Sequence, residues 1–386
     1  MPTRVRSYSK INLGLAIGAP RPNGFHTLAT LYQTLALHDL ITVSAQHAHT
    51  TRIILTSNDP RVPTDSRNTA WKMVELTLER LGLHAEVTIH LQKNLPVQGG
   101  MGAGSANAAA ALIGLVRELG LEIAPETRLD LAAQVGSDVP LFLIGGSVLG
   151  SDRGQIVNAV KDVTLAGETA IPCVVALPKI GVSTPLAFRE WDRRFAPAEG
   201  ENLHNPPIRD TLEELSRTYA SVFRQGDDSR SGASGIFPDP GSAQQQPQNH
   251  PENLQELSRE QLHGSLEQQG KSGFEIDLAE NSLLALVRTG SENQLAGTQL
   301  ENDFETVVFP QYPLLREIKR HLMGTSATGN DAVYAALSGS GSALFGLYRT
   351  QADATAAQQR LQQHGVQAIV TATMPRSLYW TNMFAE

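Results

Sequence analysis

The first forty residues alternate between apolar and polar side chains with the two-residue period of β-strands. Over residues 4–17, Lys10 and Asn12 fall on one face, and the side chains between them fall on the other. Residues 21–24, Arg-Pro-Asn-Gly, form a strong turn signal, and an apolar pattern resumes over residues 26–37. The pattern predicts a bent β segment over this part of the chain.

Strands and helices are predicted to alternate through the rest of the first half. Residues 138–140, Asp-Val-Pro, are expected to end the last of its helices, because proline does not continue a helix. The predicted strands cover residues 53–56, 87–91 and 141–149, and the predicted helices cover residues 69–81, 105–119 and 126–135. A first half rich in βαβ units is the simplest arrangement of these elements.

The second half begins with a predicted strand and a loop that contains Ser183, Thr184 and Pro185. Residues 225–273 contain many Gln, Ser, Gly and Pro residues and few apolar ones, so we expect a disordered or loosely ordered insertion. The predicted strands of this half cover residues 171–177, 332–337, 343–348 and 366–373, and its predicted helices cover residues 314–323 and 352–363.

The composition is that of one large or two ordinary globular domains, with 386 residues, of which 41% are hydrophobic and 18% charged. A net charge of −8 argues against a nucleic-acid-binding protein, which needs a basic face for phosphates. The single Cys173 allows no intramolecular disulfide. Neither a signal peptide nor a run of eighteen apolar residues is found, so we expect a soluble, cytoplasmic protein without a membrane partner.

The strongest chemical signal is a glycine-rich segment that leads into an alanine-rich helix. Four of the six residues from Gly99 to Gly104 are glycine, and Ser105 follows them at the predicted start of the helix. Glycines that adopt positive φ let an anion approach the main chain, and the free N–H groups of a helix N-terminus attract it. The segment therefore predicts a phosphate-binding loop, although a flexible loop before a core helix would show a similar pattern.

Two common nucleotide-binding motifs are excluded. The dinucleotide fingerprint requires a third small residue after the glycine pair and an acidic residue about twenty positions later, at the end of a strand, and no such strand follows. The Walker motif requires Gly, four residues, and then Gly-Lys-Ser or Gly-Lys-Thr. Residues 270–272 are Gly-Lys-Ser, but Gly264 lies one place too far upstream.

Three separated segments together resemble the signature motifs of the GHMP small-molecule kinases. They are residues 9–13 (Ser-Lys-Ile-Asn-Leu), 96–109 and 337–343 (Leu-Ser-Gly-Ser-Gly-Ser-Ala). Residues 22–27, 136–140 and 302–305 resemble one branch of the family, whose acceptor is a methylerythritol linked to cytidine diphosphate. The resemblance covers about residues 4–190 and 300–375.

The resemblance implies a two-lobed α+β fold. An ATP-binding lobe similar to domain 2 of ribosomal protein S5 is expected over residues 1–165, and a ferredoxin-like α/β sandwich over residues 166–386. It also implies transfer of the ATP γ-phosphate to the tertiary 2-hydroxyl of the acceptor, a step in non-mevalonate isoprenoid precursor biosynthesis. ATP is expected to bring Mg²⁺ with it, and no protein metal ligand is predicted.

Two alternatives remain open from the sequence. The phosphate loop does not separate this acceptor from homoserine or mevalonate, so another GHMP kinase is the first alternative. A catalytically silent ligand-binding module on the same fold is the second.

Asp138 and Lys10 are the predicted catalytic pair. Phosphoryl transfer requires positioning and neutralisation of charge rather than covalent chemistry by the protein. A rigid carboxylate that accepts the hydroxyl proton and a nearby ammonium group would meet that requirement, and we assign these roles to Asp138 and Lys10.

The resemblance assigns the remaining site residues. Asn12 is expected to bind the substrate, and the aromatic faces of the cytidine site are expected to stack on a pyrimidine. Residues 68–72 are aligned with an adenine-binding segment of the family. The predicted cytidine site contains Phe25, His26, Tyr32 and Phe188, and the predicted ATP site contains Lys93, Pro96, Gly99, Gly100, Gly102, Ala103, Gly104, Ser105 and Ala106.

The chain departs from the family pattern at four positions. The usual family pattern over residues 102–109 is Gly-Gly-Gly-Ser-Ser-Asn-Ala-Ala. In this chain Ala103 replaces a glycine and Ala106 replaces the second serine, so one serine hydroxyl for phosphate or Mg²⁺ is lost. Gln98 replaces a usual glycine, and Gln155 replaces a usual glutamate. None of these changes affects Lys10 or Asp138, so we expect activity to be retained.

Overall fold

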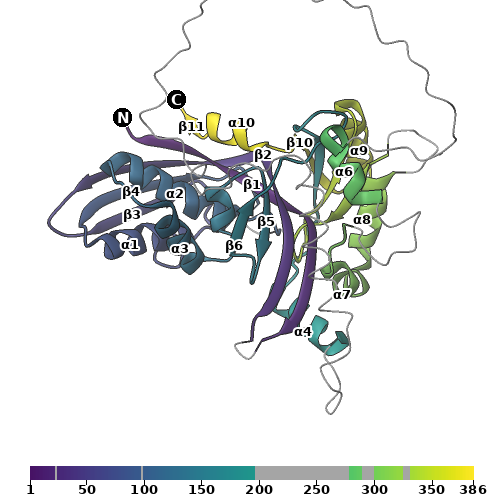
Figure 1. The fold of residues 1–386 in the computed structure, drawn as a ribbon, viewed down its shortest axis with the longest axis horizontal. Helices are drawn as coiled ribbons and strands as arrows, with labels where there is room; N and C mark the ends of the chain where they lie inside the picture. Colours follow the sequence, from purple (N-terminus) through teal and green to yellow (C-terminus); the bar gives the residue numbers. More distant parts are fainter. Residues whose placement is uncertain (22–23, 97–98, 196–277, 289–299, 325–330) are drawn as a thin grey trace, which may run out of the picture.

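A long β-hairpin passes through both halves of the protein. The computed structural model describes residues 1–21, 24–96, 99–195, 278–288, 300–324 and 331–386. Strands β1 (Thr3–Pro20) and β2 (His26–His47) pair antiparallel over their length, which confirms the predicted β segment and extends it by ten residues (Figure 1). The register shifts between Tyr8 and Lys10 and again between Asn12 and Gly14. Such irregularities bend a strand and re-aim its side chains.

The first sheet is mostly antiparallel. Its order is β11–β1–β2–β4–β3, and β5 pairs with both β2 and β6. Among the strands described, only β3 and β4 are parallel, so the expectation of a first half rich in βαβ units was wrong. A crossover helix, α1, joins that pair, whereas direct turns can join only antiparallel strands. The bounds are β3 (Arg52–Ser57), α1 (Thr69–Leu81), β4 (Ala85–Gln92), β5 (Ser147–Ser151), β6 (Ile156–Ala159) and β11 (Phe384–Ala385).

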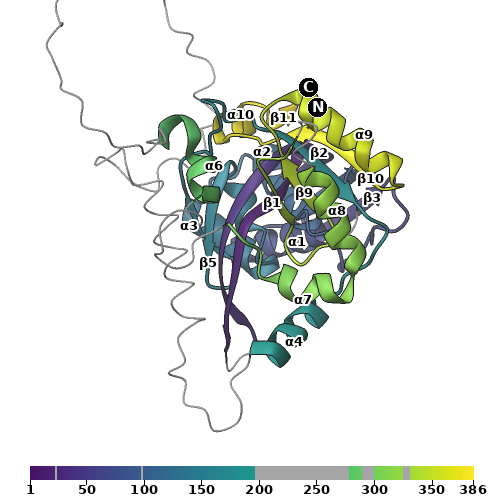
Figure 2. The same ribbon diagram turned by 90° about the vertical axis from the view of Figure 1, so that its right-hand side faces the viewer.

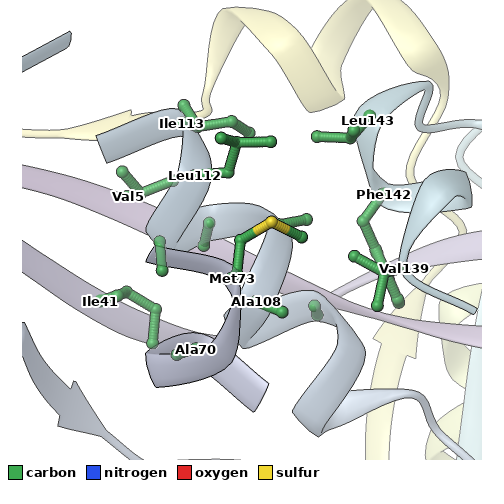
Figure 3. Packing of buried hydrophobic residues seen from close by; sticks show 14 of the residues in the cluster. Val5, Ile41, Ala70, Met73, Ala108, Leu112, Ile113, Val139, Phe142 and Leu143 are labelled. Atoms are coloured by element: carbon green, nitrogen blue, oxygen red, sulfur yellow. The ribbon is translucent and has the colours of Figure 1, made fainter. Parts of the chain in front are cut away.

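Helices cover one face of this sheet and enclose its core (Figure 3). Helix α2 (Ala103–Leu119) packs closely on β2, since a Cβ at Gly114 would lie 2.6 Å from Cγ2 of Val43. Helix α3 (Pro125–Val135) and a 3₁₀ helix, η1 (Pro140–Leu143), complete the layer. The strand predicted over residues 141–149 was therefore wrong at its start, because an unbroken apolar run has no period that separates a strand from a buried turn. The core residues shown include Val5, Ile41, Ala70, Met73, Ala108, Leu112, Val139 and Phe142.

The second sheet is four-stranded and antiparallel, in the order β10–β7–β9–β8. Its predicted strands and flanking helices are confirmed within a few residues. Thr184 and Pro185, predicted to lie in a loop, instead begin helix α4, where proline is tolerated in the first turn. The predicted insertion at residues 225–273 lies outside the described residues. The bounds are β7 (Pro172–Leu177), α4 (Thr184–Phe195), α6 (Leu278–Arg288), α7 (Phe304–Gln311), α8 (Pro313–Met323), β8 (Tyr334–Leu337), β9 (Leu344–Leu347), α9 (Gln351–Gln363) and β10 (Gln367–Ala372).

A shared core joins the two sheets. Ile11 and Leu31 of the hairpin are fully buried in one apolar cluster with Cys173 and Phe345 of the second sheet. Figure 2 shows one end of the hairpin running down beside β5 to the level of α4. The middle of the hairpin, which includes Lys10, therefore lies where the two sheets meet. The boundary between residues 165 and 166 stays a prediction.

The segment near the C-terminus returns to the first sheet. Helix α10 (Arg376–Thr381) and β11 follow the second sheet, and Ala385 pairs with Arg4 of β1. The Tyr379 hydroxyl donates to the carbonyl oxygen of Phe142 (2.6 Å). Consequently, the N and C labels lie close together in both views (Figures 1 and 2).

Candidate active site

The three sequence motifs meet around Lys10. The Lys10 N–H donates to the carbonyl oxygen of Met101 in the glycine-rich loop (3.0 Å). A Cβ at Gly102 would lie 3.1 Å from Cγ of Lys10, and a Cβ at Gly339 would lie 3.7 Å from its Nζ. Residues from β1, from the loop before α2 and from the loop after β8 therefore surround one ammonium group. The two loops are about 90 and 330 residues from Lys10 in the sequence, and the shared core brings them together with it.

The predicted catalytic pair is in contact. Nζ of Lys10 lies 3.3 Å from Oδ2 of Asp138 and donates to Oδ1 of Asn12 at 2.6 Å. The Lys10 side chain is 3% exposed and the Asp138 side chain 33% exposed, so the carboxylate remains accessible while the ammonium is almost buried. Asp138 lies just before η1, whose proline fixes the backbone after it. The pair thus has the accessible carboxylate and nearby positive charge that phosphoryl transfer requires.

Two further hydroxyl groups orient the pair. The Tyr32 hydroxyl donates to Oδ1 of Asp138 (3.0 Å). Nδ2 of Asn12 donates to Oγ1 of Thr30 (2.7 Å), whose hydroxyl donates to the Gly14 carbonyl oxygen (2.8 Å). The sequence placed Tyr32 in the cytidine site and gave no role to Thr30. The role of Tyr32 in cytidine binding stays a prediction.

The glycine-rich loop has the backbone geometry of an anion site. Gly99, Gly100 and Gly102 have φ values of 139°, 77° and 70°, as predicted. Gly104 does not, because it lies within α2. Gly102 is the N-cap of that helix, and no described side chain caps it, so Ser105 is not a capping residue. The first N–H groups of α2 are therefore available to an anion.

The second loop packs directly on the first. A Cβ at Gly100 would lie 2.2 Å from the Ser338 carbonyl oxygen, so only glycine fits there. The Ser338 hydroxyl donates to the Gly100 carbonyl oxygen (3.0 Å), and the Ala343 N–H donates to that of Gly99 (3.1 Å). Nδ2 of Asn302 donates to the carbonyl oxygens of both Leu337 and Gly339, each at 2.8 Å. Asn302 thus fixes the second loop, a role that the sequence did not reveal.

Asp303 follows Asn302, and its buried carboxyl group makes the stability of the protein depend on pH. Its Oδ2 accepts the Ile17 N–H (2.7 Å), and burial raises the pKa of Asp303 to about 6 although that hydrogen bond lowers it. A carboxyl whose pKa is higher in the folded state stabilises the fold at low pH, and this contribution is lost as pH rises from about 4 to 6.

We expect Asp303→Asn to remove this loss, because the amide oxygen still accepts the N–H without a charge. At pH 8 the variant should be more stable than the native protein by about 1–3 kcal/mol. Urea unfolding at pH 4 and pH 8 measures the difference, with Asp130→Asn on the surface as the control. Equal gains at both pH values would contradict this explanation.

Lys93, a predicted ATP-site residue, forms a buried ion pair with Asp39. The Lys93 and Asp39 side chains are 4% and 0% exposed. Oδ1 of Asp39 also accepts the N–H groups of Asn94 (2.7 Å) and Leu95 (2.8 Å), and Nδ2 of Asn107 donates to Oδ2 (3.0 Å). The pair therefore connects β2, the start of the glycine-rich segment and α2. The sequence did not reveal Asp39, because it lies 54 residues from its partner.

The predicted cytidine residues divide into a buried group and an exposed one. His26 is 6% exposed, stacks on Phe188 at 4.8 Å between ring centroids, and shares a 2.6 Å hydrogen bond with Asp192 of α4. Phe25 is 49% exposed, with the Arg153 guanidinium 4.8 Å from its ring centroid. Aromatic residues of β2 and α4 thus lie together at the end of the hairpin, and their role toward a base stays a prediction.

The predicted adenine segment contacts the phosphate loop. Asn68 caps α1 by accepting the Ala70 N–H (2.9 Å), and the Thr69 hydroxyl donates to the Gly104 carbonyl oxygen (2.7 Å). Gln155, which replaces a usual glutamate of the family, donates to the side chain of Asp152.

The described residues contain no group of three or more His, Cys, Asp or Glu side chains able to hold a metal ion. Within the same residues, every helix is too short or too polar to cross a bilayer.

Known proteins resemble both halves of the chain. The family of GHMP kinase N-terminal domains matches residues 68–146, and that of GHMP kinase C-terminal domains matches residues 278–367. A 4-diphosphocytidyl-2-C-methyl-D-erythritol kinase of Rhodococcus jostii is 38% identical over 240 residues, 61% of this chain and 74% of the relative. Its namesake in Streptomyces coelicolor is 35% identical over 245 residues, 62% of this chain and 78% of the relative.

Solved structures share the fold. A crystal structure of 4-(cytidine 5'-diphospho)-2C-methyl-D-erythritol kinase superposes with a TM-score of 0.57 at 23% identity, covering 96% of this chain and 98% of the other. A homoserine kinase from Cytophaga hutchinsonii gives a TM-score of 0.57 at 17% identity, covering 97% and 95% of the two chains. At these identities the likeness shows the fold alone. It confirms, with the two family matches, the predicted two-lobed α+β architecture.

Proposed function

Because the chain belongs to the 4-diphosphocytidyl-2-C-methyl-D-erythritol kinase family, we propose that it phosphorylates the 2-hydroxyl of that acceptor with ATP. The contact between Lys10 and Asp138, inside the junction of the three motifs, is the observation that supports catalysis most directly. It also argues against the silent ligand-binding module, in which neither charge would be needed. The likeness to a homoserine kinase concerns the fold and does not favour that acceptor.

In the proposed mechanism Asp138 acts as the general base and Lys10 stabilises negative charge. Asp138 accepts the proton of the acceptor hydroxyl as the oxygen attacks the γ-phosphorus in line with the departing ADP. Lys10 stabilises the negative charge that spreads over the equatorial phosphoryl oxygens. The N–H groups at the start of α2 bind the phosphates of the nucleotide. Mg²⁺, carried by the nucleotide, would neutralise further phosphate charge. The proposed location of the protein is the cytoplasm.

Release of ADP by the purified protein tests the proposal. The assay supplies ATP with 4-diphosphocytidyl-2-C-methyl-D-erythritol, homoserine or mevalonate in turn. We expect turnover with the first acceptor alone. Turnover only with homoserine or mevalonate would assign the chain to a different reaction, and no turnover with any acceptor would favour the binding module.

Removing the ammonium of Lys10 should affect kcat more than KM. In Lys10→Met the aliphatic part of the side chain remains, but the positive charge that acts on the transferring phosphoryl group is lost. We expect kcat to fall roughly 100-fold or more while both KM values change only a few-fold. Steady-state ADP release measures both. A change confined to KM would make Lys10 a ground-state binding residue.

The cytidine site predicts selectivity between pyrimidines. Phe25, His26 and Phe188 would bind cytosine, whose N4 donor and N3 acceptor are exchanged for an acceptor and a donor in uracil. A buried partner left unpaired costs about 1–3 kcal/mol, so CDP should compete with the acceptor roughly ten-fold or more better than UDP. Inhibition constants from the ADP-release assay test this selectivity. Equal inhibition by CDP and UDP would argue against the assigned site.

A further inference from the structure

The two carboxylate oxygens of Asp138 have different partners. Oδ2 faces Nζ of Lys10 at 3.3 Å, and Oδ1 accepts the hydroxyl of Tyr32 at 3.0 Å. Lys10 comes from β1 and Tyr32 from β2, so two neighbouring strands hold the same carboxylate from different directions. Nζ of Lys10 also lies 5.5 Å from the centroid of the Tyr32 ring. These are the titratable groups that contact Asp138 in the described part of the chain.

The Tyr32 ring is held in a closely fitting space. Tyr32 is 2% exposed and pairs with Asn12 on one side and with Val148 on the other. A Cβ at Gly150 would lie 2.5 Å from Cε2 of Tyr32, and a Cβ at Gly154 would lie 2.5 Å from its hydroxyl oxygen. Both glycines therefore leave room for the ring and for its hydroxyl. A side chain enclosed in this way keeps its hydroxyl at a fixed point.

The Tyr32 hydroxyl acts as a donor and not as a base. Burial, together with the nearby negative charge of Asp138, raises the pKa of Tyr32 well above its usual value. The phenol therefore stays protonated and donates a hydrogen bond to the carboxylate. A donated hydrogen bond favours the charged form of a carboxylate and fixes its plane.

We propose that Tyr32 is a positioning residue for Asp138, in addition to the catalytic pair and in place of a contact with cytosine. Its hydroxyl holds Oδ1, Lys10 holds Oδ2, and one lone pair on each oxygen remains for the acceptor hydroxyl. The inference rests on the proposed function for its kinetic consequences, but the contact itself can be tested without a substrate. Without the hydroxyl, Oδ1 loses the donor that fixes the plane of the carboxylate and favours its charged form.

Tyr32→Phe tests the proposal, because it removes one oxygen and keeps the ring. We expect kcat for ADP release to fall about ten-fold, with KM for the cytidine-linked acceptor unchanged within two-fold, and the acidic limb of the kcat profile to move to higher pH. Tyr348→Phe is the matched control. Its hydroxyl is also buried and donates to a backbone carbonyl oxygen, that of Leu322 (2.8 Å), so its loss should leave the pH profile in place.

A substrate-free measurement separates this inference from the proposed function. In protein labelled with ¹³C at the aspartate carboxyl groups, Asp138→Asn identifies the Asp138 resonance. We expect Tyr32→Phe to raise the pH at which that resonance titrates, and Tyr348→Phe to leave it unchanged. An unchanged titration would overturn the inference, and so would a raised KM for the acceptor with an unmoved profile, which is the signature of a cytosine contact. Absence of turnover in the native protein would overturn the proposed function alone.

Discussion

Asp138→Asn should slow turnover by orders of magnitude while both ligands still bind. The amide has the shape of the carboxylate, and its oxygen still accepts the Tyr32 hydroxyl, but it takes no proton from the acceptor. Loss of a general base is typically worth roughly 10²–10⁴-fold in rate. We therefore expect kcat to fall within that range, measured as ADP release under saturating substrates.

Binding must be measured separately for this result to be informative. Calorimetric titration with CDP and with a non-hydrolysable ATP analogue should give dissociation constants within a few-fold of the native values. Asp130→Asn, which removes an exposed carboxylate of α3 that pairs with Arg80 on the surface, is the control. Full activity of Asp138→Asn would remove this residue from the mechanism.

Asp39→Asn should be the most destabilising of these substitutions. It leaves the Lys93 ammonium buried without its counter-charge, and the new amide N–H group would face two other donors, Nζ of Lys93 and Nδ2 of Asn107. Breaking one side of a buried ion pair typically costs about 3–5 kcal/mol. Urea unfolding followed by circular dichroism should show this loss.

The reciprocal variants separate structure from nucleotide binding. Lys93→Met should cost less than Asp39→Asn, because Asp39 keeps the N–H groups of Asn94 and Leu95 as donors. The double variant should be more stable than Asp39→Asn alone, since no unpaired charge remains buried. If Lys93 instead served mainly to bind adenine, Lys93→Met would raise KM for ATP and leave the unfolding midpoint in place.

Local signals in the sequence were sufficient for some elements. Helix α1 was predicted at its observed bounds, and the structure adds Asn68 as its cap and Gly82 in the left-handed conformation after it. The bent β segment was predicted from alternation and from one turn signal, and the structure shows that it is a hairpin. The contact between Lys10 and Asp138 was predicted from a resemblance that already linked these distant segments.

Other features had no local signal. Helix α4 begins with Thr184-Pro185, a pair that is as typical of loops as of a first helical turn. Asp39 contacts Lys93 and Tyr32 contacts Asp138 only in the observed register of β2. That register is set by side-chain packing and cannot be read from the periodicity alone. Buried polar contacts between segments far apart in the sequence are therefore the part of the site that needed coordinates.

The return of α10 and β11 to the first sheet has a consequence for biosynthesis. A ribosome releases β1, β2 and α2 long before it releases Tyr379, whose hydroxyl and ring cover Phe142 and Gly145. The nascent first lobe therefore waits, with part of its apolar core uncovered, until about 230 further residues have been translated. Because closing such a loop is slow, folding of this lobe is completed near the end of translation, and chaperones that bind exposed apolar segments have time to act on it.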